Sequence, residues 1–186
     1  MIGWFVIAAV VFILLWFVIV YNRLVSLRND VQNSWKQIDV QLKRRHDLIP
    51  NLVSTVKGAM EYEQDTLEKV ISARARAVSA ATPHAKAEAE NVLTQALGRL
   101  FAVMENYPAL TANQNVMHLQ EELTTTENRI SFARQLYNDL VANYRTMLQV
   151  FPNNLVSSIF NFRPEDYFEA EQAARVVPEV NLSLRK

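Results

Sequence analysis

The sequence predicts an all-α protein in which one N-terminal transmembrane helix continues into an antiparallel four-helix bundle of long, coiled-coil-like helices. An uncharged apolar stretch of about 20 residues opens the chain, which is the length that spans a bilayer. Only 3 Gly and 6 Pro occur among 186 residues, so few positions interrupt regular structure. Beyond the apolar stretch, apolar residues recur at steps of three and four, which is typical of amphipathic helices. We divide the chain into an anchor (1–22), a helical bundle domain (23–162) and an irregular tail packed on or near the bundle (163–186).

The anchor extends from Ile2 to Tyr21 without a charged side chain. At 1.5 Å per residue this segment is about 30 Å long as a helix, the thickness of the hydrocarbon core. A cleaved signal peptide would have a basic start and small residues at a cleavage site, and neither is present, so we expect the segment to be retained. Trp4, Trp16 and Tyr21 lie near its two ends and suit the headgroup layer, although ordinary lipid-facing packing explains them nearly as well.

Basic residues are distributed unevenly around the anchor. None precedes it, whereas Arg23, Arg28 and Lys36 follow it. Basic residues favour the cytoplasmic side of a membrane. We therefore expect the N-terminus to lie outside and the helical domain to lie in the cytoplasm.

The first helix should continue from the membrane to about Arg45, because an apolar stripe repeats along it at helical spacing. Asp47 can cap a second helix that has Pro50 in its first turn, where a missing backbone donor is tolerated, so a tight turn is expected between the two helices. The second helix extends to an Ala-rich tract that ends at Ala81. The two predicted stripes consist of Leu24, Leu27, Val31, Trp35, Ile38 and Leu42, and of Leu52 or Val53, Val56, Met60, Leu67, Val70 or Ile71, and Ala73.

Thr82 and Pro83 suit the N-cap and first position of a third helix, which Tyr107-Pro108 ends. The third stripe consists of Val92, Leu93, Ala96, Leu100, Val103 and Met104. The fourth helix has the most regular, heptad-like pattern. Its stripe consists of Val116, Leu119, Leu123, Thr126, Ile130, Ala133, Tyr137, Leu140, Tyr144, Met147 and Phe151. A turn at residues 152–154 and a short apolar segment to Phe162 follow.

No residue pattern indicates a reaction. The chain has no Cys, which excludes disulfides, thiolate metal sites and Cys nucleophiles. The three His lack metal-site spacing, and the isolated Gly residues form no phosphate-binding loop. Lys plus Arg and Asp plus Glu number 19 each, so the general charge of a nucleic-acid binder is missing. We therefore expect no enzyme activity, no cofactor or metal, no nucleic-acid partner and no small-molecule substrate.

Two groups of residues are candidates for interactions. The basic run Lys43, Arg44 and Arg45 can attract anionic lipid or an acidic partner, but it lies about 30 Å of helix beyond the membrane, more than three Debye lengths, so a solvated or intramolecular pairing role is favoured. His46 beside it is expected to be solvated or capping. A C-terminal aromatic group can form a docking patch or oligomer contact, although capping the open end of the bundle is favoured. Its members are Phe151, Phe160, Phe162, Tyr167 and Phe168.

Several segments together resemble the LemA family over nearly the whole chain. They are Met1-Ile2-Gly3-Trp4, Tyr21 to Val25, Asp39 to Val53, Thr55 to Gly58, Glu105 to Pro108, Thr126 to Ile130, Tyr137-Asn138 and Phe151-Pro152-Asn153. The resemblance implies an α-helical bundle anchored in a bacterial inner or plasma membrane, with the N-terminus outside. It implies no agreed enzymatic activity, and a relative in magnetotactic bacteria is linked to magnetosome formation. The sequence departs from the family pattern where Lys, Phe and Gly are common, at Thr111, Val116 and Asn161.

The leading functional hypothesis is a membrane-anchored scaffold or interaction protein without catalysis of its own. Its expected partners are the lipid bilayer and either further copies of the chain, in a homo-oligomer, or another membrane protein. The alternative is a regulatory accessory subunit of a membrane enzyme such as a protease.

Overall fold

A computed structural model describes residues 1–168 of the chain. These residues form helices and connecting segments and contain no strand. The helices are α1 (Ile2–Val56), α2 (Gln64–Ser79), α3 (Pro83–Met104), α4 (Pro108–Thr111), α5 (Gln114–Gln149) and α6 (Asn153–Ile159).

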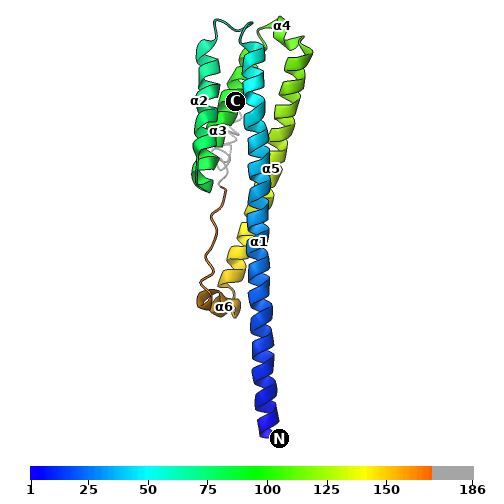
Figure 1. The fold of residues 1–186 in the computed structure, drawn as a ribbon, viewed down its shortest axis with the longest axis vertical. Coiled ribbons are helices and arrows are strands. Elements are labelled where there is room, and N and C mark those ends of the chain that lie inside the picture. Colours follow the sequence, from blue (N-terminus) through cyan, green and yellow to red (C-terminus); the bar gives the residue numbers. More distant parts are fainter. Residues whose placement is uncertain (169–186) are drawn as a thin grey trace, which may run out of the picture.

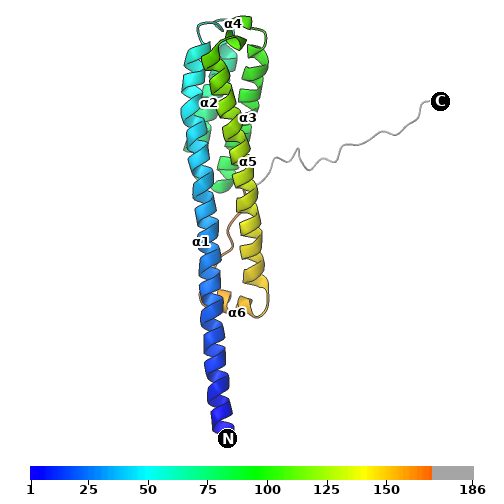
Figure 2. The same ribbon diagram turned by 90° about the vertical axis from the view of Figure 1, so that its right-hand side faces the viewer.

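The two longest helices, α1 and α5, run antiparallel in close contact (Figures 1 and 2). The α2–α3 hairpin packs beside them at the end far from the N-terminus, so the four helices alternate in direction as an up-down bundle. At the opposite end of α5, α6 lies beside α1, and the N-terminal part of α1 projects alone beyond it (Figures 1 and 2). The predicted all-α bundle with a long apolar N-terminal helix is confirmed.

The first helix is longer than predicted, because it continues past Arg45 to Val56 with Pro50 in its interior. Proline lacks a backbone N–H, so Pro50 leaves the carbonyl of His46 without its usual helical donor. The Nε of Arg74 on α2 donates to that carbonyl at 2.7 Å. The prediction of a tight turn near Asp47 was wrong. The helix continues through this region, and Arg74 supplies the hydrogen bond that Pro50 cannot make.

The connection between α1 and α2 lies instead at residues 57–63, where Met60 is fully buried. The second helix therefore begins at Gln64. The start of α3 is as predicted, because the side-chain oxygen of Thr82 accepts from the backbone N–H of Ala85 at 3.2 Å. The short α4 was not predicted, and the Asn113 side chain caps α5 after it.

Most of the stripe predicted for the fourth helix is buried in α5, from Val116 to Tyr144. Beyond Tyr137 the buried positions become Val141 and Leu148 rather than Leu140 and Met147. The assignment of Phe151 to the seam was wrong, because α5 ends before it and its side chain is 75% exposed.

A turn was predicted at residues 152–154, but α6 already begins at Asn153. After α6 the chain reverses at Asn161, whose φ of 53° lies in the left-handed region. Glycine adopts this conformation most easily and asparagine tolerates it, so either residue suits the position.

The bundle has two cores along the α1–α5 pair. The distal core lies between this pair and the α2–α3 hairpin, and its buried side chains are aliphatic or Met, among them Ile49, Leu52, Met60, Leu93 and Leu100. The proximal core lies nearer the membrane segment and is rich in aromatic rings, among them Trp35, Tyr137, Tyr144, Phe162 and Phe168. Close to the turn that joins α2 to α3, Lys86 on α3 pairs with Asp39 at 2.6 Å and lies over the Trp35 ring.

Residues 163–168 run back along the bundle as an extended segment (Figure 1). The hydroxyl of Tyr137 donates to the Asp166 carbonyl at 2.8 Å. The Asn138 side chain both donates to the carbonyl of Phe168 and accepts from its N–H. The first part of the predicted tail thus completes the proximal core, and residues 169–186 lie outside the described part of the chain.

Candidate functional site

The three anchor residues, Trp4, Trp16 and Tyr21, lie in the N-terminal part of α1. One stretch in this helix is long and apolar enough to cross a membrane, and its side chains are exposed except near α6, where Val20 is buried. Trp4 is 80% exposed, whereas Trp16 and Tyr21 are half-buried near α6. The aromatic residues at the end that joins the bundle therefore contact protein as well as the surroundings.

The basic run at residues 43–45 divides among three environments. Lys43 is exposed, Arg44 pairs with Glu122 on α5, and Arg45 is buried. The hydrogen bond and positive charge of Arg44 hold the pKa of the Glu122 carboxyl below its usual range. Arg45 is consequently unavailable to a partner.

Arg45 lies at the centre of a buried charge network that joins three helices. Its Nη1 lies 3.2 Å from the Glu90 carboxylate on α3 and 2.9 Å from the Glu127 carboxylate on α5. Its Nη2 donates to the hydroxyl of Thr94 at 2.9 Å. The Glu90 carboxylate is fully buried and also lies 2.7 Å from Nε2 of His46. The expectation that His46 is solvated was wrong, because Glu90 holds it inside.

Arg134 on α5 extends this network towards the proximal core. Its guanidinium lies over the Phe168 ring at 4.6 Å, while its Nε and Nη2 are buried without a hydrogen-bond partner. Burial lowers the pKa of this side chain, and the nearby carboxylates of Glu127 and Glu90 oppose that effect.

The network has the contacts of a structural element rather than of a reaction centre. Both oxygens of Glu90 are occupied, one by Arg45 and one by His46. Buried ion pairs of this kind fix the relative positions of helices, because removing one partner leaves the other charge without compensation. Among the described residues, no group of three or more His, Asp or Glu side chains could hold a metal ion.

The aromatic C-terminal residues are spread along the α1–α5 pair. Phe160 and Phe162 contact Tyr21, Tyr167 lies against Arg145, and Phe168 packs on Trp35. Phe168 is buried and Phe151 is 75% exposed, so the members of this group differ in their surroundings. The cap interpretation and the docking alternative both stay predictions.

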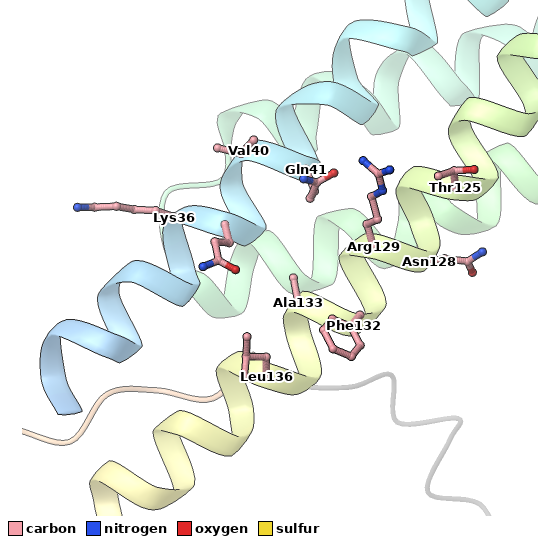
Figure 3. Close-up of a pocket in the computed structure, with 10 residues that line it drawn as sticks. Lys36, Val40, Gln41, Thr125, Asn128, Arg129, Phe132, Ala133 and Leu136 are labelled. Carbon is pink, nitrogen blue, oxygen red and sulfur yellow. The ribbon is translucent and has the colours of Figure 1, made fainter. Parts of the chain in front are cut away.

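The face of the α1–α5 pair that is turned away from the α2–α3 hairpin contains a groove of about 620 Å³ (Figure 3). Three apolar side chains of this groove are exposed to solvent: Phe132 is 71% exposed, Val40 64% and Leu136 39%. Its two charged lining residues, Lys36 and Arg129, are both cationic. We call this surface the α1–α5 groove.

Neither the charge network nor the α1–α5 groove was predicted from the sequence. Glu90 and Arg45 are far apart in sequence, so their contact depends on the tertiary fold. Phe132 offered a weak signal, because it is a large aromatic residue two positions after the buried Ile130 and outside the α5 stripe. Such a residue is either exposed or turned towards a partner.

The family model described as "LemA family" matches residues 34–182 of the chain. The chain belongs to the LemA family. The matched region contains the charge network, the α1–α5 groove and α6.

Several named proteins are similar to this LemA family member. Magnetosome protein MamQ 2 of Paramagnetospirillum magneticum is 25% identical, and magnetosome protein MamQ of Magnetospirillum gryphiswaldense is 24% identical. Each alignment covers 82% of this chain and 66% of the relative, so the chain spans slightly less than two thirds of their length. Protein LemA of Metamycoplasma hominis is 23% identical over 83% of this chain and 71% of its own length.

Proposed function

We propose that this LemA family member is a membrane-anchored scaffold that binds another membrane protein through the α1–α5 groove and catalyses no reaction itself. The open apolar groove carries this proposal. Large exposed apolar surfaces on a folded domain are typical of protein contacts. The buried side chains of Arg45, His46 and Glu90, in contrast, contact one another.

The chemistry of the α1–α5 groove specifies the kind of partner. Phe132 and Leu136 on α5 and Val40 on α1 provide exposed apolar side chains, and Lys36 and Arg129 provide positive charge beside them. An amphipathic helix with acidic residues beside its apolar stripe would satisfy both features, since helix-in-groove binding buries the stripe and pairs the charges. We propose such a helix, from a protein held in the same membrane, as the occupant.

The proposed location is a bacterial inner membrane, with the N-terminus outside and the bundle in the cytoplasm. The basic residues that follow the apolar stretch support this orientation. The Cys-free chain allows a direct test: Tyr62→Cys places a thiol at a position that is 95% exposed in the far loop. A membrane-impermeant thiol reagent should label it only after permeabilisation, and labelling of intact cells would reverse the orientation.

The docking proposal is tested by photo-crosslinking from the full chain in its membrane. A photoreactive residue replaces Phe132, and in a matched control it replaces Ile71, an exposed residue of α2. We expect an adduct from position 132 in which the linked peptide is an acidic amphipathic helix of another membrane protein. Adding Lys36→Glu and Arg129→Glu should abolish this adduct.

Two results would contradict the docking proposal. One is equal adduct yield from positions 132 and 71, and the other is an adduct unaffected by the charge reversals. An adduct of two copies of this chain would replace the proposed partner by self-association. A linked peptide from a membrane enzyme, with altered enzyme activity in the charge-reversed variant, would favour the accessory-subunit alternative.

A further inference from the structure

Exposed apolar side chains recur along the short stretch from the end of α5 to the end of α6. Phe151 is 75% exposed, Leu155 52%, Ile159 67% and Phe160 48%. Within α6, Val156 is buried in the proximal core, whereas Leu155 and Ile159 lie four residues apart on the outward side. A helix whose outer side meets water normally has polar residues there. We call these four exposed residues the basal patch.

The basal patch lies where α1 leaves the predicted membrane span. The Phe160 ring is 5.7 Å from Phe17 and 4.6 Å from Tyr21, measured between ring centroids. Both partners belong to the last two turns of the apolar stretch. Figures 1 and 2 show α6 beside α1 at the level from which α1 projects alone. The patch is therefore continuous with the apolar surface of the span.

We propose that the basal patch inserts into the interfacial layer of the bilayer that α1 crosses, as a second membrane contact. This inference rests on the proposed membrane anchoring of α1. Short apolar helix faces can lie about 5–10 Å deep at the boundary between headgroups and acyl chains. The phenylalanines and aliphatic residues of the patch suit that depth, and they need not cross the membrane.

Charged residues near the patch suit a bilayer surface. Arg23 follows Tyr21 by two residues and Arg163 follows Phe162, and both are exposed. Cationic side chains close to a bilayer are attracted by anionic headgroups. Asp166 is also exposed, but it lies farther along the segment that returns towards the bundle. Anionic lipid should therefore strengthen the contact.

The second contact restricts the orientation of the domain. A single spanning helix leaves a domain free to tilt relative to the membrane. Contact on one side, through α6, would restrict this tilt. It would consequently restrict the angle at which the α1–α5 groove stands to the bilayer.

The test uses the full chain reconstituted in vesicles of phosphatidylcholine and phosphatidylglycerol. Single Cys residues replace Ile159, Tyr62 or Ile13 and receive an environment-sensitive fluorophore. Tyr62 is the control for water, and Ile13, within the apolar stretch, is the control for insertion of α1. Quenching is measured with nitroxide-labelled lipids and with aqueous iodide.

We expect the fluorophore at Ile159 to be quenched by shallow nitroxide lipid and to be protected several-fold from iodide relative to Tyr62. Iodide quenching equal to that at Tyr62, with Ile13 reporting lipid, would overturn the inference while leaving the anchor intact. Protection from iodide without lipid quenching would also overturn it, and would assign the patch to a second protein copy. If Ile13 itself reports water, the anchoring of α1 fails, and the inference fails with it.

A matched pair of variants tests the orienting effect. Leu155→Glu with Ile159→Glu places charge in the basal patch, whereas Ile71→Glu with Val78→Glu alters equally exposed aliphatic residues of α2. Energy transfer from a dye at Tyr62 to acceptors on the membrane surface should change only in the first variant. Equal transfer in both variants would contradict the orienting role.

Discussion

The distal and proximal halves of the bundle share the same two helices, α1 and α5, but are completed in different ways. In the distal half, a second pair of helices supplies closely packed aliphatic side chains. In the proximal half, α6 and the segment 163–168 take their place. Large aromatic rings of α1, α5 and the segment after α6 pack together in this half. The proximal core is therefore built from larger side chains than the distal core.

The halves also differ in how their polar groups are satisfied. The distal half ends at the network of Arg45, His46, Glu90 and Glu127, whose side chains form ion pairs. The proximal half relies on neutral hydrogen bonds from Tyr137 and Asn138 to the backbone of the returning segment. The distal half should therefore be more sensitive to the loss of one side chain.

The largest effect is expected from Glu90→Ala. This change leaves Arg45 buried with only Glu127 and Thr94 as partners, and breaking a buried ion pair typically costs about 3–5 kcal/mol. Denaturant unfolding of the detergent-solubilised chain measures the loss. Glu88→Ala, on the exposed side of α3, should change the free energy of unfolding by less than about 0.5 kcal/mol. Equal effects of the two changes would show that the network contributes nothing specific.

Tyr137→Ala should destabilise the proximal half by about 3 kcal/mol, because a buried aromatic side chain is lost together with its packing on Trp35. The loss should appear first as faster proteolysis after residue 162, since Tyr137 holds the Asp166 carbonyl. Cleavage in the α2–α3 hairpin serves as the comparison. Faster cleavage there instead would show that the two halves do not unfold separately.

Strong base should release the same contact. Burial raises the pKa of the Tyr137 hydroxyl to about 12, above its usual value of 10.0. The protonated form is favoured in the folded state, so its contribution is fully present below pH about 10 and is lost as pH rises towards about 12, by about 2–3 kcal/mol. Tyr137→Phe should lack this part of the pH dependence. Identical curves for both proteins above pH 10 would contradict the assignment.

Thr82→Ala should have a smaller effect, of about 1 kcal/mol, because it removes the side-chain cap of α3. Hydrogen exchange should increase in the first turn of α3 and leave α6 unchanged. Thr82→Ser, which keeps the capping oxygen, is the control. Increased exchange in α6 would indicate that the halves are coupled more tightly than their separate cores suggest.

The smallest effect on stability is expected from Phe132→Ser in the α1–α5 groove, within about 0.5 kcal/mol, because the side chain is exposed. The same change should nevertheless weaken partner crosslinking from a photoreactive residue at Val40. A large loss of stability would show that Phe132 supports the fold rather than docking.

The helices were largely predictable because their signals are local. The stripe of α5 and the Thr82-Pro83 start of α3 follow from spacing and capping alone. The end of α1 was not predictable, because the donor that replaces the hydrogen bond missing at Pro50 is Arg74, from another helix. Local rules treat such a proline as a boundary.

The candidate surfaces were less predictable than the fold. The basic run suggested an interaction, but only the arrangement of three helices shows that Arg45 is buried against Glu90. The C-terminal aromatic residues were singled out as one group, yet Phe168 is buried and Phe151 is exposed. The sequence shows that several aromatic residues occur close together near the C-terminus. The path of the chain in three dimensions determines which of these rings are buried.

The continuity of α1 through Pro50 sets the distance between the apolar stretch and the rest of the bundle. A rigid helix with a rise of 1.5 Å per residue places Val40 about 28 Å beyond Tyr21, the end of the apolar stretch. With the proposed span in the bilayer, α1 would hold the α1–α5 groove at a set distance from the membrane. The proposed partner, held in the same membrane, would have to present its helix at that distance, so its dimensions as well as its sequence would decide recognition.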